Sequence, residues 1–165
     1  MREVPLSSVS GAVSLTYTTD LAAVRALVRR CTKEAGLSEQ RGIDMVIAVG
    51  EVAANTVQHA GTAGRLDIWY DNAEIVCQIT DEGFISDPLA GARAPQPGAT
   101  TGYGLWMVNQ VCDQVDLHSD ETGTTIRMHM NLKDLLPVQR EHRDIVSSAP
   151  DHGWLGGSPP VRAPL

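Results

Sequence analysis

Positive charge is scarce in this sequence. It holds 13 lysine and arginine residues against 20 aspartates and glutamates, which gives a formal net charge of −7 at pH 7. This balance gives the molecule as a whole no attraction to nucleic acid or to an anionic membrane surface. We therefore expect neither nucleic acid nor a membrane among its partners.

Long apolar runs and paired cysteines are also lacking. No stretch approaches the roughly 20 apolar residues of a transmembrane helix, and the opening Met-Arg-Glu-Val-Pro lacks the apolar core of a signal peptide. Cys31, Cys77 and Cys112 lie far apart and form no Cys-x-x-Cys pair. They are typical of small core residues in a reducing compartment rather than of disulfides or zinc ligands. The expected location is the cytoplasm.

What remains has the composition of a globular domain, with 42% hydrophobic residues in a chain of 165. Alternating apolar and polar residues predict five strands, of which the second and third form one hairpin and the last two another. The strands are expected at residues 11–18, 65–70, 73–80, 115–119 and 124–132.

Three helices are predicted from apolar residues that recur with helical spacing. The first follows the capping residues Thr19 and Asp20 and ends at Gly36. The second begins after Ser38 and runs to about residue 60, and the third covers 105–112. The expected buried stripe of the second helix consists of Ile43, Ile47, Gly50, Ala54 and Val57.

This order of elements favours an α+β fold with two layers, one mixed and mostly antiparallel sheet with three helices on one face. Residues 1–132 would form the domain. Residues 133–165 mix charges with many prolines and glycines, so we expect a flexible tail there. Residues 87–104 are rich in Pro, Gly, Ala and Thr and lack hydrophobic periodicity, which predicts a functional loop or lid.

The second helix carries a polar stripe, Glu51, Asn55 and His59, at positions i, i+4 and i+8. Residues four apart are neighbours on a helix. An amide oxygen such as that of Asn55 suits Mg²⁺, and Glu51 could take a proton from a hydroxyl or water near the same metal. The alternative is a solvated helix face, and for His59 a capping or packing role.

Two later segments offer partners for this stripe. Asp81-Glu82-Gly83 ends a predicted strand, where a carboxylate can accept a hydrogen bond from an exocyclic amine such as that of adenine. Thr101-Gly102-Tyr103-Gly104-Leu105 stands where a glycine-rich loop becomes a helix, a place where free backbone N–H groups bind phosphate. Taken singly, the first is an ordinary strand-ending turn and the second a glycine-assisted helix start.

In this order and spacing, the segments resemble the nucleotide-binding boxes of the GHKL ATPases, which have the Bergerat fold. Glu51, Asn55 and His59 are similar to the N box, Asp81-x-Gly83 to the first glycine box, and Gly102-x-Gly104-Leu105 to the second. Gly123-Thr124-Thr125 is similar to the terminal Gly-Thr element. The Glu-x3-Asn-x3-His-Ala form and Gly104-Leu105-Trp106-Met107 resemble the RsbW-like anti-sigma factors and serine-protein kinases of actinobacterial type.

The resemblance implies a role for each matching residue. Glu51 would be the catalytic base, Asn55 the Mg²⁺ ligand and Asp81 the adenine reader, supported by Thr124. The phosphate clamp would be Gly102 and Gly104, beneath a lid of residues 86–101. The implied nucleotide-binding set is Asn55, Asp81, Gly83, Thr101, Gly102, Tyr103, Gly104, Leu105 and Thr124, with ATP and Mg²⁺ as cofactors.

The resemblance also implies partners and an activity. The protein would be an anti-sigma factor that holds a sigma factor and phosphorylates an antagonist, a STAS-type domain, on serine or threonine. Relatives often form homodimers through the N-terminal strand and first helix. Two alternatives are a nucleotide-binding module that sequesters its partner without phosphoryl transfer and a detached histidine-kinase catalytic domain.

Two residues depart from the family pattern. Ile85 stands where the fuller Asp-x-Gly-x-Gly box has its second glycine, and Tyr103 stands where a basic residue often separates the second-box glycines. The absence of that positive charge removes one candidate for steadying the γ-phosphate, a role that Arg93 in the lid would take.

Overall fold

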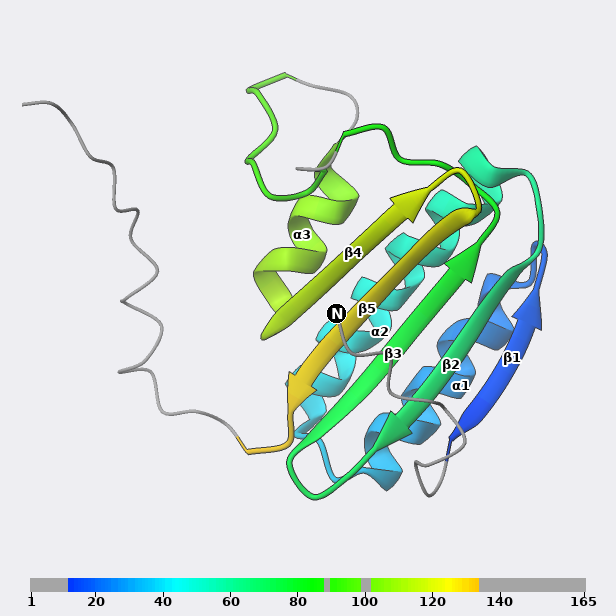
Figure 1. Ribbon diagram of the computed structural model, residues 1–165. Coiled ribbons are helices and arrows are strands. Elements are labelled where there is room, and N and C mark those ends of the chain that lie inside the picture. Colours follow the sequence, from blue (N-terminus) through cyan, green and yellow to red (C-terminus); the bar gives the residue numbers. More distant parts are fainter. Residues whose placement is uncertain (1–11, 88–89, 99–101, 134–165) are drawn as a thin grey trace, which may run out of the picture. The chain divides into compact units, whose positions relative to one another are not determined.

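Five strands form one sheet in the order β1-β2-β3-β5-β4 (Figure 1). The computed structural model describes residues 12–87, 90–98 and 102–133. The strands are β1 (Val13–Tyr17), β2 (Gly64–Tyr70), β3 (Glu74–Asp81), β4 (Gln114–Asp120) and β5 (Gly123–Asn131). They confirm the strands and both hairpins expected from the alternation.

The sheet is wholly antiparallel within the described residues, not mixed as expected. The connection from β3 through the third helix brings the chain back parallel to β3, as β4 at the sheet edge. β5 then returns between β3 and β4 and pairs with both. β3 and β4 are therefore parallel to each other but are separated by β5.

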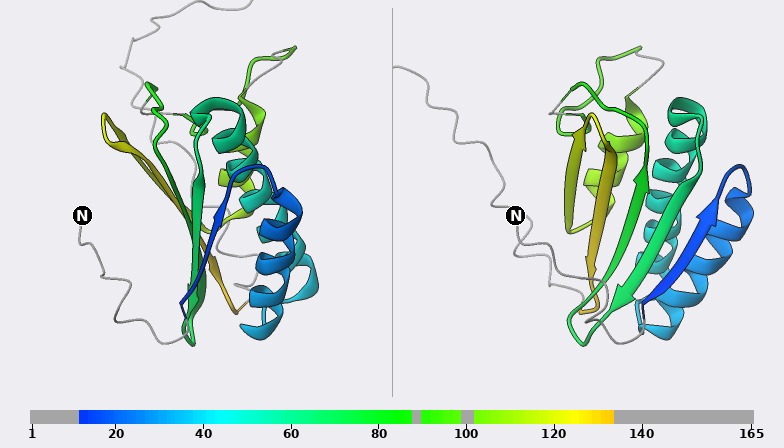
Figure 2. Two further views of the ribbon diagram at one scale, coloured as in Figure 1. Left: turned by 90° about the vertical axis from the view of Figure 1, so that its right-hand side faces the viewer. Right: turned by 45° about the vertical axis from the view of Figure 1, so that its right-hand side comes forward.

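Helices α1 (Leu21–Glu34), α2 (Glu39–Asn55) and α3 (Tyr103–Val111) cover one face of this sheet (Figure 2). The Asp20 carboxylate accepts a hydrogen bond of 2.9 Å from the backbone N–H of Ala23, so it caps α1 as expected. α1 and α2 follow each other closely and pack side by side. The expected two-layer α+β architecture is confirmed.

The core lies between the sheet and the helices, where inward-facing residues of neighbouring strands align in rows. One row pairs Leu66 with Ile79 and Ile79 with Ile126, and the next pairs Ile68 with Cys77 and Cys77 with Met128. All of these residues are buried. Cys31, Cys77 and Cys112 are free, buried thiols, as expected from their spacing.

The buried face of α2 differs from the expected stripe. Gly50 is buried, but Ile43 and Ile47 keep 47% and 43% of their surface exposed, and Met45 and Val49 face the interior instead. Because α2 packs against α1, α3 and the sheet, it buries several faces rather than one. The central turns of α2 are almost entirely apolar. The sequence was therefore equally compatible with two assignments of its buried face.

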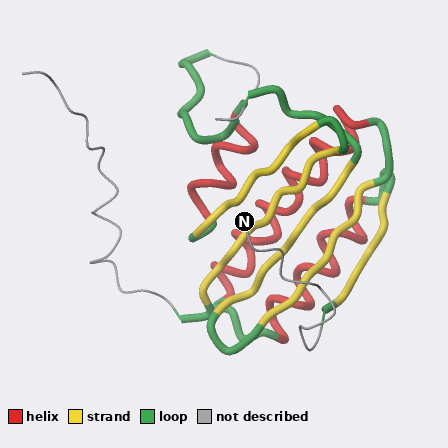
Figure 3. The backbone as a smooth tube through the Cα atoms, in the orientation of Figure 1, coloured by secondary structure: helices red, strands yellow, loops and turns green. Residues whose placement is uncertain are grey.

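The segment between β3 and α3 contains no helix or strand in its described residues, 82–87, 90–98 and 102 (Figure 3). This agrees with the irregular loop expected there. The chain divides into two compact units, Met1–Asp134 and Leu135–Leu165. The second unit, and with it the expected tail beyond Lys133, lies outside the described residues.

Candidate functional site

A cleft of about 750 Å³ opens where the end of α2, the segment after β3 and the start of α3 come together. These three segments meet at the upper end of the sheet in Figure 1. The cleft is lined by sequence-predicted residues from or beside all three, which are Asn55, His59, Asp81, Gly83, Gly102, Gly104 and Leu105, and by Thr124 at the start of β5. The structure thus brings together parts of the chain that are almost 70 residues apart.

The last turn of the second helix is not α-helical. Residues Thr56–Ala60 form the π-helical turn η2, which ends at Gly61 in the left-handed conformation, with φ of 63°. Single π-turns within helices occur frequently at functional sites. The wider turn places Asn55, Thr56 and His59 on the cleft wall, although His59 itself is largely exposed.

The Asp81 carboxylate is held from both sides. Thr56 Oγ1 donates to Asp81 Oδ2 at 2.6 Å, and the backbone N–H of Gly83 donates to Oδ1 at 2.8 Å. Each carboxylate oxygen can accept two hydrogen bonds, so capacity remains for a further donor. Nearby, burial raises the pKa of the Tyr17 hydroxyl, and the Asp81 charge adds to the rise.

Gly83 is needed for a reason that the sequence did not reveal. A Cβ at this position would lie 2.9 Å from both Ala60 Cβ and Asp81 Oδ1, closer than real Cβ contacts. The expected role was to let a flat ring approach the backbone. In the structure, the close neighbours of Gly83 are the end of η2 and the carboxylate itself.

Thr124 forms hydrogen bonds that hold the segment following Asp81. Its Oγ1 donates to the carbonyl oxygen of Gly83 at 2.8 Å, so its remaining bond, to Ser119 Oγ at 2.7 Å, is one in which Ser119 donates. Ser119 Oγ in turn accepts from the backbone N–H of Ile85 at 2.8 Å. The β4–β5 hairpin therefore fixes the backbone on both sides of Phe84.

The start of α3 lies against the polar stripe of α2. A Cβ on Gly104 would stand 3.1 Å from Glu51 Oε2 and 3.8 Å from Asn55 Nδ2, so only glycine leaves this space open. Gly102, with φ of 91°, precedes the helix, and no side chain caps it. The first backbone N–H groups of α3 thus lack intrahelical partners and carry the positive end of the helix dipole.

The loop before α3 is attached to that helix. Gly91 has φ of 78°, and a Cβ there would lie 2.8 Å from the backbone of Leu105. Asn109 Nδ2 donates to the carbonyl oxygens of Gly91 at 3.3 Å and Leu105 at 3.1 Å. Arg93 lines the cleft from this loop, on the side expected for the lid.

Three of the expected site residues are not among the residues that line the cleft. Glu51 is half-buried beside Gly104, one turn before Asn55, and is not among the lining residues. Tyr103 is 45% exposed and also lies outside the lining. Thr101 falls outside the described residues.

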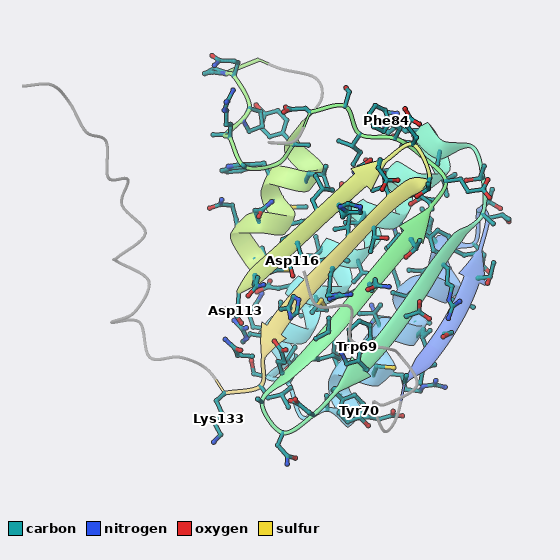
Figure 4. All side chains as sticks on the ribbon, in the orientation of Figure 1. Trp69, Tyr70, Phe84, Asp113, Asp116 and Lys133 are labelled. Atoms are coloured by element: carbon teal, nitrogen blue, oxygen red, sulfur yellow. The ribbon has the colours of Figure 1, made fainter. Side chains whose placement is uncertain are left out.

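Three residues at the site were missed from the sequence. Thr56 and Ser119 hold Asp81 and the segment after it, and Phe84, 64% exposed, stands at the cleft. Figure 4 shows Phe84 at the end of the sheet opposite Asp113 and Lys133. Pairing Ser119 with Thr124 across the predicted hairpin could have found Ser119, whereas nothing local marks Thr56.

The donor set of the cleft fits a magnesium–nucleotide complex. No group of three His, Cys, Asp or Glu side chains that could hold a metal occurs among residues 12–87, 90–98 and 102–133. Mg²⁺ usually takes one or two protein oxygens and fills its shell with phosphates and waters, so a single amide oxygen from Asn55 suffices. A neutral oxygen ligand beside a helix N-terminus matches that chemistry.

Fold and cleft together define an α+β nucleotide-binding domain. The chain belongs to the family of histidine kinase-like ATPase domains, whose sequence profile matches residues 14–130. The GHKL resemblance read from the three boxes is thereby confirmed. Membership implies ATP binding.

The chain is also similar to two other proteins. Serine-protein kinase RsbW of Halalkalibacterium halodurans is 31% identical over an alignment of 99 residues that covers 52% of this chain and 59% of RsbW. The chain thus spans somewhat more than half the length of that relative. A structure of the RsbU and RsbW domains of a Mycobacterium tuberculosis protein matches with a TM-score of 0.55 at 18% identity, over 73% of this chain and 32% of the other. That match supports the fold.

None of the described helices has the length and apolar character needed to cross a membrane.

Proposed function

We propose that this protein is an ATP-dependent protein-serine/threonine kinase that also sequesters a sigma factor and phosphorylates the antagonist that releases it. The observation that carries the proposal is the meeting of Asn55 and Glu51 with the start of α3 at Gly104. In this arrangement an amide oxygen that could ligate magnesium and a carboxylate lie beside the N–H groups at the start of α3, which would suit phosphate. The similarity to serine-protein kinase RsbW supports the choice of hydroxyl acceptor.

Each end of the cleft has its own task in this proposal. Asp81, oriented by Thr56 and the N–H of Gly83, would accept a hydrogen bond from the adenine amine. Asn55 would ligate Mg²⁺, which neutralises charge on the phosphates. The backbone N–H groups around Gly102 and Gly104 would bind the phosphate oxygens.

Phosphoryl transfer is then mainly a matter of positioning. The hydroxyl oxygen of the antagonist forms a bond to the γ-phosphorus as the bond from that phosphorus to the β–γ bridging oxygen breaks, and ADP leaves. Glu51 would take the hydroxyl proton, and Arg93 would steady the charge on the transferred group. Arg93 is the only lysine or arginine among the described residues that line the cleft.

A second candidate function is nucleotide binding without transfer. Its specific support is Tyr103, which occupies the place of a basic residue and is not among the residues that line the cleft. The start of α3 therefore contributes no cationic side chain to the phosphates. In this case, nucleotide would order the loop while the protein holds its partner.

Transfer of label from γ-labelled ATP to a protein distinguishes the two candidate functions. The protein is incubated with γ-labelled ATP, Mg²⁺ and antagonist proteins encoded beside its gene, together with Glu51→Ala, Asn55→Ala and Glu34→Ala variants. Glu34 is the last residue of α1, lies outside the cleft lining and serves as the matched control. We expect acid-stable label on the antagonist, lost in the first two variants and kept in Glu34→Ala.

Other outcomes decide against the kinase. ATP binding without label on any antagonist favours the binding module. Acid-labile label indicates histidine phosphorylation and a histidine-kinase catalytic domain. Failure to bind ATP would contradict the whole proposal.

A further inference from the structure

A second hollow, of about 720 Å³, lies between α1 and α2 at the ends of these helices that are remote from the nucleotide cleft. Its lining comes from the last turns of α1, the turn at Leu37 and Ser38, and the first turns of α2. We call it the α1–α2 groove. Nothing in the proposed phosphoryl transfer uses it.

The α2 wall of this groove is apolar and uncovered. Ile43 and Ile47, one turn apart, are 47% and 43% exposed, and Val46 lies between them at 8%. Only four large hydrophobic residues are exposed among the residues that the structure describes, and two of them are these isoleucines. Such clustering of exposed apolar surface, rimmed by polar residues, marks interaction sites.

The α1 wall is basic. Arg29 and Lys33, also one turn apart, are exposed and line the groove, and neither has a carboxylate partner among the described residues. In a chain of net charge −7, α1 carries four cationic side chains and one carboxylate, Glu34, which pairs with Arg30 at 3.7 Å. Glu39 is the one acidic residue in the lining.

The floor between the walls is made of small residues. A Cβ on Gly42 would stand 3.4 Å from Thr32 Oγ1, so α1 and α2 approach closely there. The lining residues recur at helical spacing on both helices, and the groove therefore runs along them. A groove between two packed helices accepts the side-chain ridge of a third helix.

We propose that the α1–α2 groove docks an amphipathic helix of a protein partner. Its apolar stripe would cover Ile43, Val46 and Ile47, and carboxylates one turn apart would pair with Arg29 and Lys33. This is recognition by a helix in a groove, with charge complementarity setting its register. The inference rests on the proposed partner-holding function for the identity of the partner, but not on phosphoryl transfer.

Selection from a phage library of short helix-forming peptides tests the groove on the full chain. We expect enriched peptides with an apolar stripe beside carboxylates at i and i+4. Fluorescence anisotropy measures the Kd of a synthesised peptide. Arg29→Glu and Lys33→Glu should each raise this Kd roughly tenfold, and Ile47→Glu should raise it as well. Arg30→Glu, with the same charge change on α1 but outside the groove lining, should leave its Kd unchanged.

A charge swap makes the test specific. A peptide with its carboxylates replaced by lysines should bind the Arg29→Glu/Lys33→Glu protein better than the wild type. ATP affinity should be the same in every groove variant, so a defect in the nucleotide cleft is distinguishable from one in the groove.

Three results would overturn the proposal. They are failure to enrich any helical peptide, enrichment of peptides without carboxylates, and peptide binding that the groove variants leave unchanged. Sedimentation adds a fourth: a wild-type dimer that Ile47→Glu converts to monomer would show that a second copy of this chain covers the groove. Peptide binding without kinase activity would leave the groove standing and contradict only the proposed transfer.

Discussion

The carboxylate of Asp81 is held in one orientation within the cleft. Its two carboxylate oxygens accept hydrogen bonds from different elements, from Thr56 on η2 and from the Gly83 backbone after β3. The carboxylate therefore cannot rotate without breaking one of them. An adenine amine would meet an acceptor whose direction is already fixed, which reduces the entropy lost on binding.

Replacing Asp81 by asparagine should weaken ATP binding and reduce selection for adenine. The charged acceptor is lost, and hydrogen bonds to charged groups contribute about 2 kcal/mol, roughly a thirtyfold change in Kd. The Asp81→Asn amide can also donate to the carbonyl oxygen of guanine. Titration calorimetry with ATP and GTP should show a smaller preference for ATP.

The neighbouring carboxylate supplies the control for this change. Glu82 is exposed and is not part of the cleft lining, so Glu82→Gln removes the same charge one residue away. Its ATP affinity should match that of the wild type. Equal effects of the two substitutions would mean that Asp81 acts only through the general field of the site.

At the scale of elements, the loop and α3 form one side of the cleft as a unit. Asn109 bonds the carbonyl of Gly91, and the Gly91 Cα lies against the Leu105 backbone. Gly98, in the same loop, has a similar φ of 85°, but a Cβ there would meet nothing within 4 Å. A comparison of substitutions at Gly91 and Gly98 therefore distinguishes the effect of backbone strain from the effect of a steric clash.

Gly91→Ala should detach the loop from α3, whereas Gly98→Ala should not. Both substitutions impose a left-handed alanine at roughly 1–2 kcal/mol, but only the first also places a methyl group 2.8 Å from backbone atoms. Limited proteolysis should cut the Gly91→Ala loop faster, and its ATP affinity should fall more. Identical cleavage rates in the two variants would show that the loop is not held through Gly91.

The same scale shows what the sequence could predict. Alternation located all five strands, because the apolar residues of each recur with a period of two. The face of α2 was assigned wrongly, because a helix packed on several sides has no single apolar stripe. The π-turn η2 has no local signature, and the docking of Gly83 against Ala60 depends on a contact between residues far apart in sequence.

Within the candidate site, the sequence identified the residues by type and spacing but not their support. Asp81, Gly83 and Thr124 were found as separate elements of a pattern. That Thr124 acts through the Gly83 carbonyl, and Ser119 through the Ile85 N–H, follows from the β3–β5 and β4–β5 register. Such bonds arise from tertiary pairing, which no single segment contains.

For the molecule as a whole, the buried thiols make the free energy of unfolding depend on pH in the alkaline range. Burial raises the pKa of Cys112 to about 12, and it raises the pKa of Cys77 and Cys31 as well. In the unfolded chain these thiols ionise near pH 8.5. Above that pH the folded state binds more protons than the unfolded state, so the free energy of unfolding falls as pH rises.

Urea denaturation between pH 7 and pH 10 should measure this fall, to which Cys112 alone contributes about 2 kcal/mol. A Cys112→Ala variant should be less stable at pH 7, because it loses buried contacts, yet its stability should decline less with pH by that amount. Lysines and tyrosines titrate in the same range in both proteins, so the difference between the two profiles isolates the thiol. Parallel profiles would mean that Cys112 ionises as readily in the folded protein as in the unfolded chain, which contradicts its burial in the connection between α3 and β4.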